Sequence, residues 1–189
     1  MKRWLCVLAC VWLAGCTGVQ VEDYADQQPR LDLQQFFDGP VEAWGMFQNR
    51  SGKVIKRFHV QIDSRRDGER LILDERFTYS DGSTDRRVWT LTPDGQQAWR
   101  GTAADVAGEA RGELAGNAFR WRYSLNLPVD DQVYVVHFDD WMYLIDEHTL
   151  VNRASMRKFG IEWGQVTLFF RRQVQGAACA HWGQPTGHW

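Results

Sequence analysis

The chain has 189 residues, and its 22 Lys and Arg nearly balance its 24 Asp and Glu. Because no basic block follows Arg3, nucleic acid is not expected as a partner. The length suffices for one domain with a sizeable core, and ten Trp and ten Phe residues can fill that core with large apolar side chains.

The N-terminal segment is laid out as a secretory signal. Residues 1–3 contain the basic pair Lys2-Arg3, residues 4–13 are apolar, and Ala14 and Gly15 come directly before Cys16. The apolar run is too short to span a membrane as a helix, so residues 1–15 are expected to be a signal peptide that is removed.

The arrangement Leu13-Ala14-Gly15-Cys16 is similar to the lipobox of bacterial lipoproteins. The resemblance implies that cleavage leaves Cys16 as the N-terminus and that Cys16 carries acyl chains such as palmitate on its thiol and its amine. Several chains are needed for stable anchoring in a membrane. Thr17 stands where an Asp would favour the inner membrane, so the resemblance implies the outer membrane, on its periplasmic face. An ordinary signal peptide with an incidental cysteine is the alternative.

Cysteine usage excludes an intrachain disulfide in the mature chain. Cys6 and Cys10 leave with the signal peptide and Cys16 becomes the anchor, so Cys179 is the one thiol left. Stability is therefore expected to come from packing.

The mature chain divides into three parts. Residues 16–30 are polar without a period and are expected to be a lipidated tether. Residues 31–172 carry strand patterns, and residues 173–189 show no alternation and are expected to be a disordered tail. Leu31 to Phe37 predicts a short helical turn, which Gly39-Pro40 ends.

Strand patterns separated by turn signals fill residues 31–172. Phe119 to Leu127 alternates apolar and polar residues along its length, as a half-buried strand does. Pairs such as Asp67-Gly68 and Asp81-Gly82 predict hairpin turns, and short connections join antiparallel neighbours. We therefore expect an all-β, antiparallel up-and-down barrel, whose closure removes exposed edges. The other predicted strand segments include residues 54–62, 71–79, 87–91, 133–138, 141–145, 150–156 and 166–170.

Arginines on the predicted outer faces argue against a transmembrane barrel. Arg86, Arg87, Arg120 and Arg122 would be costly against lipid.

The segment Gly101 to Gly116, rich in Gly and Ala, has two interpretations. Either the wall is thin there because a ligand or another backbone approaches closely, or a strand bends or bulges in a tightly curved barrel.

The stretch Phe36-Phe37-Asp38-Gly39 followed by Trp44-Gly45 resembles the entry to a lipocalin-type barrel, although the spacing is looser than usual. The resemblance implies a tryptophan at the start of the first strand, covered by a basic residue late in the last strand. Arg171 or Arg172 would cover Trp44 in this way.

A second resemblance rests on residues 138–144, 150–155 and 158–160 together with Phe37-Asp38-Gly39. These segments resemble an uncharacterised family of proteobacterial lipoproteins, domain of unknown function 3833, from the lipobox to about Arg172. The family implies a small envelope lipoprotein with a lipocalin-like barrel, and it brings no established activity.

Two residue clusters are candidates for catalytic or metal sites. His137, Asp139 and Asp140 lie together in the sequence, but neighbours on a strand point to opposite faces, so the two carboxylates cannot share one substrate without a bulge. Cys179, His181 and His188 fit no known zinc spacing. With no nucleophile elbow or phosphate loop, we expect no enzyme activity, metal or cofactor.

Binding is the better-supported function. Apolar positions that would point into the barrel are interspersed with polar ones, as in a cavity for an amphiphilic ligand. The hypothesis is an outer-membrane lipoprotein that binds a lipid or other small hydrophobic molecule. The alternatives are a structural or assembly lipoprotein with a filled core that engages an envelope protein, and an enzyme acting on lipid-like substrates in the cavity. The expected ligand contacts are Lys56, Phe58, Glu75, Phe77, Trp121, Tyr123, Met142, Asn152 and Lys158.

Overall fold

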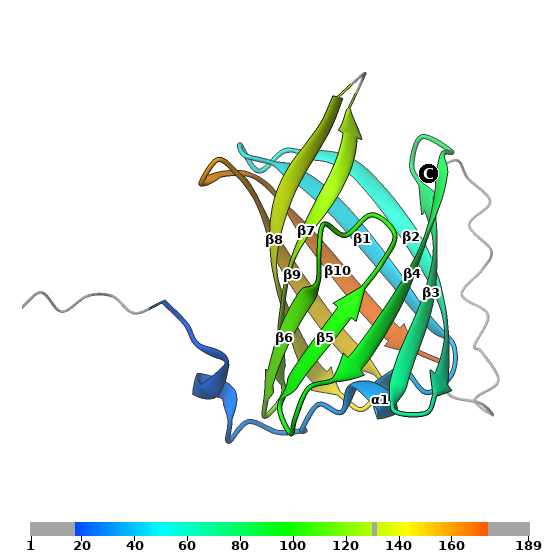
Figure 1. Ribbon diagram of the computed structural model, residues 1–189. Helices are drawn as coiled ribbons and strands as arrows, with labels where there is room; N and C mark the ends of the chain where they lie inside the picture. The colour runs from blue at the N-terminus through cyan, green and yellow to red at the C-terminus, as the bar shows by residue number, and fades with distance from the viewer. Residues whose placement is uncertain (1–17, 130–131, 174–189) are drawn as a thin grey trace, which may run out of the picture.

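The computed structural model describes residues 18–129 and 132–173. Ten antiparallel strands form a closed barrel in which each strand pairs with its sequence neighbours and β1 pairs with β10 (Figure 1). The strands are β1 (Val41–Asn49), β2 (Val54–Asp67), β3 (Arg70–Tyr79), β4 (Thr84–Pro93), β5 (Ala98–Thr102), β6 (Ala110–Ala115), β7 (Ala118–Val129), β8 (Gln132–Asp146), β9 (Thr149–Lys158) and β10 (Ile161–Arg172).

The predicted fold class is confirmed, with differences in the strands. The segments predicted over residues 133–138 and 141–145 form one continuous strand, β8. The stretch rich in Gly and Ala supplies the end of β5 and all of β6, two short strands that no alternation indicates. Cys16, the predicted signal peptide and the tail from residue 174 lie outside the described residues.

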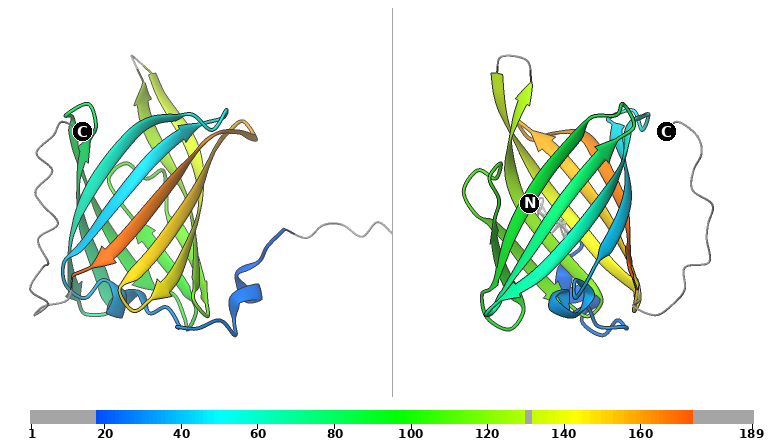
Figure 2. Two further views of the ribbon diagram at one scale, coloured as in Figure 1. Left: turned by 180° about the vertical axis from the view of Figure 1, so that it is seen from behind. Right: turned by 90° about the vertical axis from the view of Figure 1, so that its right-hand side faces the viewer.

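A short helix closes one end of the barrel. Helix α1 (Leu33–Phe36) lies within the predicted helical turn, and Asp32 caps it by accepting a hydrogen bond from the Gln35 amide at 3.0 Å. Leu33 and Phe36 are buried against the barrel core. Figures 1 and 2 show α1 across the end opposite the β7–β8 hairpin, and among the described residues no helix lies across the other end. We call these the closed end and the open end.

The glycines of β5 and β6 make room for aromatic rings. A Cβ on Gly101 would overlap the Trp121 ring, and one on Gly112 would overlap the Phe119 ring. The rings of Trp121 and Trp89 meet across this region, with centroids 5.6 Å apart. The close approach that the glycines indicated is therefore made by the protein's own side chains.

The loop between β5 and β6 completes the wall above these short strands. Its Val106 forms an isolated antiparallel bridge with Leu125 of β7. The Ala107 amide donates to the Ser124 carbonyl, and the Asn126 amide donates to the Asp105 carbonyl, both at 2.8 Å. The loop thus pairs with residues 124–126 of β7, beyond the part of β7 that pairs with β6.

Part of the expected tether is docked on the barrel. A 3₁₀ turn, η1 (Val21–Tyr24), contacts β6 and β7, and Tyr24 packs on the rings of Trp141 and Tyr143. Further on, the Leu31 amide donates to the Gly116 carbonyl at 2.8 Å. The sequence does not predict these contacts, because residues 16–30 are mostly polar and few apolar residues make them.

None of the helices within residues 18–129 and 132–173 combines the length and apolar character needed to cross a membrane.

One prediction about an individual side chain on the wall was wrong, the placement of Arg87 on the outer face. Arg87 lies on the inner face of β4, in register with Glu75, whereas Arg86 points outward and binds Asp74 at 2.7 Å. Trp44 points outward, 40% exposed, and its ring packs on His59, and the cation–π contacts of the described residues do not join it to Arg171 or Arg172. Val41 and Ala43 take the inward positions of β1, which places Trp44 on the opposite face of the strand.

Candidate functional site

The interior of the barrel divides into a packed half and an open half. Toward the closed end, side chains such as Leu71, Phe119 and Leu150 are fully buried around α1. A cavity of about 50 Å³ remains there, lined by apolar side chains and by one charged residue, Glu75. Toward the open end, inward-facing side chains of the barrel keep part of their surface accessible, among them Phe58 and Phe77.

Aromatic rings line the open half on the β2–β3 side. Phe58, Phe77 and Tyr79 lie within 6.1 Å of one another, centroid to centroid. Lys56 lies over the Tyr79 ring at 4.5 Å and forms an ion pair with Asp81 at 2.8 Å. This wall offers flat apolar surface to a ligand, while its one lysine is already neutralised.

Lys158 occupies an aromatic surround on the opposite side of the open end. Only 6% of the residue is exposed. Its ammonium lies 3.2 Å from the Tyr134 ring centroid and 4.7 Å from that of Trp163. Among the described residues no carboxylate forms an ion pair with it, so cation–π contacts stabilise this charge.

A belt of charged and polar groups crosses the middle of the barrel. The Arg87 guanidinium binds both carboxylate oxygens of Asp105, at 2.6 to 3.1 Å. The Tyr123 hydroxyl donates to one Asp140 oxygen at 3.0 Å. The other Asp140 oxygen is buried without a hydrogen-bond partner, and no hydrogen bond or ion pair within the described ranges involves the Glu75 carboxylate. We call Glu75, Arg87, Asp105, Tyr123 and Asp140 the polar belt.

Burial changes the titration of the polar belt. Desolvation raises the pKa of Glu75 to about 7, with Arg87 opposing the change. Desolvation also raises the pKa of Asp140 to about 7, partly offset by the hydrogen bond from Tyr123. Both carboxyls therefore change charge near neutral pH, inside the barrel.

Substituting Glu75 with glutamine is expected to stabilise the protein at alkaline pH. The folded protein holds the Glu75 proton up to about pH 7 while the unfolded chain releases it near 4.5, so the free energy of unfolding falls as pH rises between these values. The neutral amide of the Glu75→Gln variant abolishes this loss, which gives a gain on the order of 2 kcal/mol at pH 8 and almost none at pH 4. Urea denaturation across this pH range measures it.

The matched control is Asp74→Asn. Asp74 is the neighbour of Glu75 on the outer face, and its hydrogen bond with Arg86 lowers its pKa. This variant should lose stability at pH 8 rather than gain it. Equal gains at pH 4 and pH 8 for Glu75→Gln would contradict a buried, proton-holding Glu75.

All the predicted ligand contacts occupy inward positions, but they do not form one site. Trp121 and Asn152 are packed in the core, and the Asn152 amide donates to the Trp141 carbonyl at 3.4 Å. Glu75 and Met142 border the small cavity, and Tyr123 belongs to the polar belt. The remaining contacts lie in the open half and are Lys56, Phe58, Phe77 and Lys158.

The sequence reasoning missed three members of the polar belt. Asp140 shares the parity of buried Phe138, and Arg87 shares that of buried Trp89, so strand alternation could have found both. Asp105 lies in the β5–β6 loop, where no periodic signal exists.

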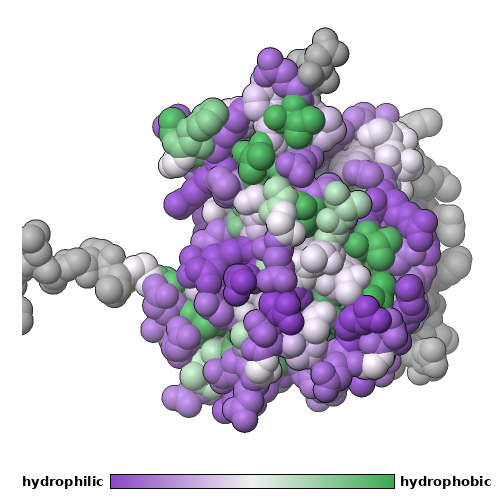
Figure 3. Space-filling view, viewed as in Figure 1, coloured by the Kyte–Doolittle hydropathy of each residue, from purple (hydrophilic) through white to green (hydrophobic). Residues whose placement is uncertain are grey.

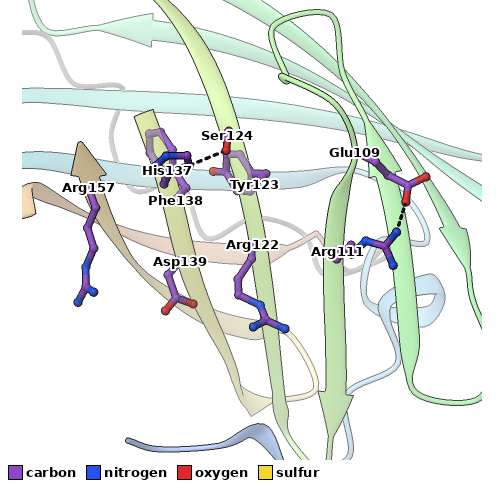
Figure 4. A pocket seen from close by; sticks show the side chains of 9 residues that line it. All are labelled: Glu109, Arg111, Arg122, Tyr123, Ser124, His137, Phe138, Asp139 and Arg157. Atoms are coloured by element: carbon purple, nitrogen blue, oxygen red, sulfur yellow. Dashed lines mark hydrogen bonds and ion pairs between the residues drawn. The ribbon is translucent and has the colours of Figure 1, made fainter. Parts of the chain in front are cut away.

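A second hollow lies on the outer face of β6 to β9. It has a volume of about 540 Å³ and is bordered by charged side chains that include Arg122 and Arg157 (Figure 4). His137 Nδ1 and Ser124 Oγ lie 2.8 Å apart there. Asp139 faces this side and binds Arg120 at 2.7 Å, while Asp140 faces the interior, which agrees with the separation predicted from strand alternation.

Metal binding finds no support in the described ranges. No group of three or more His, Cys, Asp and Glu residues within residues 18–129 and 132–173 could hold a metal ion. The trio of Cys179, His181 and His188 lies outside these ranges.

Exposed apolar side chains gather near the open end. Figure 3 shows hydrophobic surface toward this end and mostly polar surface toward the closed end. Those on the upper parts of β8 and on the β9–β10 hairpin are Val133, Val135, Phe159, Ile161 and Trp163. We call these five residues the apolar rim.

The closed up-and-down barrel with a short helix across one end is a lipocalin-like fold. The chain belongs to the family described as "Protein of unknown function (DUF3833)", whose model matches residues 10–172. No curated protein sequence is significantly similar to it.

Two solved structures show the same type of fold. The S-type phycobiliprotein lyase CpeS from Guillardia theta is 8% identical, with a TM-score of 0.55 over 83% of this chain and 100% of that one. A protein of unknown function of the DUF3598 family from Nostoc punctiforme is 15% identical, with a TM-score of 0.54 over 84% of this chain and 53% of that one. At these identities the likeness extends to the fold alone.

Proposed function

We propose that the protein is an outer-membrane lipoprotein that holds one small amphiphilic or apolar molecule in the open half of its barrel. The observation that carries this proposal is the accessible surface of inward-facing aromatic side chains above a sealed, packed end. Apolar walls with a few polar groups are typical of small-molecule sites, and up-and-down barrels commonly hold one such ligand. The apolar rim would form the entrance.

The same observation disfavours a solid core that only supports contacts with protein partners. Phe58 and Phe77 face inward yet remain partly accessible, which a completely packed interior would prevent. We do not propose an enzyme activity, because the His137–Ser124 pair on the outer face has no third group that orients it among the described contacts.

Lipidation of Cys16 would orient the barrel on the membrane. An extended chain spans at most about 3.6 Å per residue, so the residues between Cys16 and η1 reach less than about 20 Å. Because η1 and Leu31 are docked on β6, β7 and the turn that joins them, the closed end would face the anchoring membrane. The open end would then face away from it, accessible to a ligand or a donor of the ligand.

Photo-crosslinking of the full-length protein in membranes tests the proposal. The probe is a dodecanol analogue with a diazirine in its alkyl chain, and adducts are mapped by peptide mass spectrometry. We expect adducts on inward-facing residues of the open half. Val166→Trp, which adds bulk to the interior, should reduce them about tenfold because it occupies the ligand's space.

The control is Thr167→Trp, the adjacent residue of β10 on the outer face. It should leave interior labelling unchanged, and thermal melts should show both variants folded. Interior adducts that survive Val166→Trp, or adducts confined to the outer face, would contradict ligand binding in the barrel.

A further inference from the structure

The charged groups of the polar belt and of the open half are unequally paired. The three cations there each have a partner, since Arg87 binds Asp105, Lys56 binds Asp81, and Lys158 lies between aromatic rings. Two of the carboxylates, in contrast, are incompletely paired. Within the described residues, Glu75 has no hydrogen bond or ion pair, and Asp140 Oδ1 has no partner although the residue is only 6% exposed.

These two carboxylates act in one electrostatic field. Arg87 influences both of them, and Glu75 also influences Asp140. Glu75, Asp105 and Asp140 together carry three potential negative charges, against the single positive charge of Arg87. Buried polar atoms are normally paired, so an orphaned oxygen on a buried acid indicates a missing hydrogen-bond donor.

The existing cations are poorly placed to bind an anionic ligand. A carboxylate or phosphate would have to displace Asp105 from a bidentate pair with Arg87 or remove Lys158 from its aromatic surround. A ligand with a positively charged nitrogen needs no such rearrangement, because within the described residues the Glu75 carboxylate and the Oδ1 oxygen of Asp140 have no partner.

We infer that the ligand carries a protonated amine or similar N–H donor, which enters first and binds Asp140 and Glu75, with its apolar part extending past Phe58 and Phe77 toward the open end. This inference rests on the proposed function and assigns its ligand class. Tyr123 holds Asp140 Oδ2 through its hydroxyl, which leaves Oδ1 to accept from the ligand.

Binding should strengthen with pH. The ligand's cation requires ionised carboxylates, and both acids ionise near pH 7, where an alkylamine is still protonated. The other groups that face them are Arg87 on β4, Asp105 on the β5–β6 loop and Tyr123 on β7, with Asp74 and Asp139 beside them on their own strands. Affinity is therefore expected to rise between pH 6 and pH 8.

The test compares three diazirine probes with the same alkyl chain, derived from dodecylamine, dodecanol and dodecanoic acid, on the full-length protein in neutral phosphatidylcholine vesicles. At pH 8 the amine probe should label the interior at least about tenfold more than the alcohol probe, the order expected for one charge-assisted bond. At pH 6 this preference should shrink. Asp140→Asn should abolish it, whereas Asp139→Asn, the outward-facing neighbour, should retain it.

The outcomes separate the two claims. If the alcohol and acid probes label the interior as well as the amine probe does, the ligand class is wrong while the binding function stands. If no probe labels the interior, the binding function itself fails. Should Asp140→Asn unfold, Glu75→Gln must reduce the amine preference, and an unchanged preference in that variant overturns the inference.

Discussion

Replacing Trp121 with alanine is expected to lower the free energy of unfolding by about 4 kcal/mol, as for other fully buried aromatic residues. Trp121 is 4% exposed, and its ring packs against Trp89 and Phe119 above the inner face of Gly101. The cavity left behind cannot close, because β5 and β6 present glycines rather than side chains that could move in. Equilibrium urea denaturation followed by circular dichroism measures the loss.

Trp44→Ala is the matched control for this prediction. Trp44 is 40% exposed on the outer face and contacts His59, so its removal should cost about 1 kcal/mol. If Trp121→Ala cost no more than Trp44→Ala, the prediction would be contradicted. Trp121 would then line a ligand cavity, as the sequence predicts, and the packed half would be smaller than described.

Replacing Gly116 with valine is expected to release the N-terminal segment and to cost about 3 kcal/mol. Gly116 has φ +53°, in the left-handed region, which a β-branched residue rarely adopts. A Cβ there would also overlap the carbonyl oxygen of Tyr24, so η1 must move away. The readout is limited trypsin digestion, in which cleavage after Arg30 should become much faster.

Gly108→Val is the control that introduces backbone strain without disturbing the contact between Gly116 and the N-terminal segment. Gly108 has φ +82°, but a Cβ there would meet no atom within 4 Å. This variant should lose some stability while cleavage after Arg30 stays slow. Equal protection of Arg30 in Gly116→Val and in the unaltered protein would show that residues 18–30 are not held by this contact.

Strand alternation predicted the fold well where one face of a strand is buried. Phe119 to Leu127 is the clearest case, because each inward aromatic alternates with an outward polar residue. The same rule fails for β5 and β6, where Gly101 and Gly112 occupy inward positions and bury a neighbour's ring instead of their own side chain. Apolar periodicity detects buried side chains and cannot detect space that is left for another residue.

The candidate site was predictable only in part for a related reason. Glu75 is predictable because a charged residue interrupts an apolar face, and Arg87 could have been found in the same way. However, Asp105 reaches Arg87 from a loop, and only the closed topology brings β3, β4 and β8 around one interior. Pairing partners across a barrel depend on tertiary contacts, which local sequence patterns do not specify.

Methionine methyl NMR of the full-length protein in nanodiscs tests binding in the barrel most directly. Met142 and Met156 face the interior, whereas Met46 lies on the outer face of β1. On titration with dodecanol, the methyl resonance of Met156 should shift more than that of Met142, which borders the small cavity toward the closed end, while that of Met46 stays in place. Shifts confined to Met46, or no shift at any of the three, would contradict a ligand site inside the barrel.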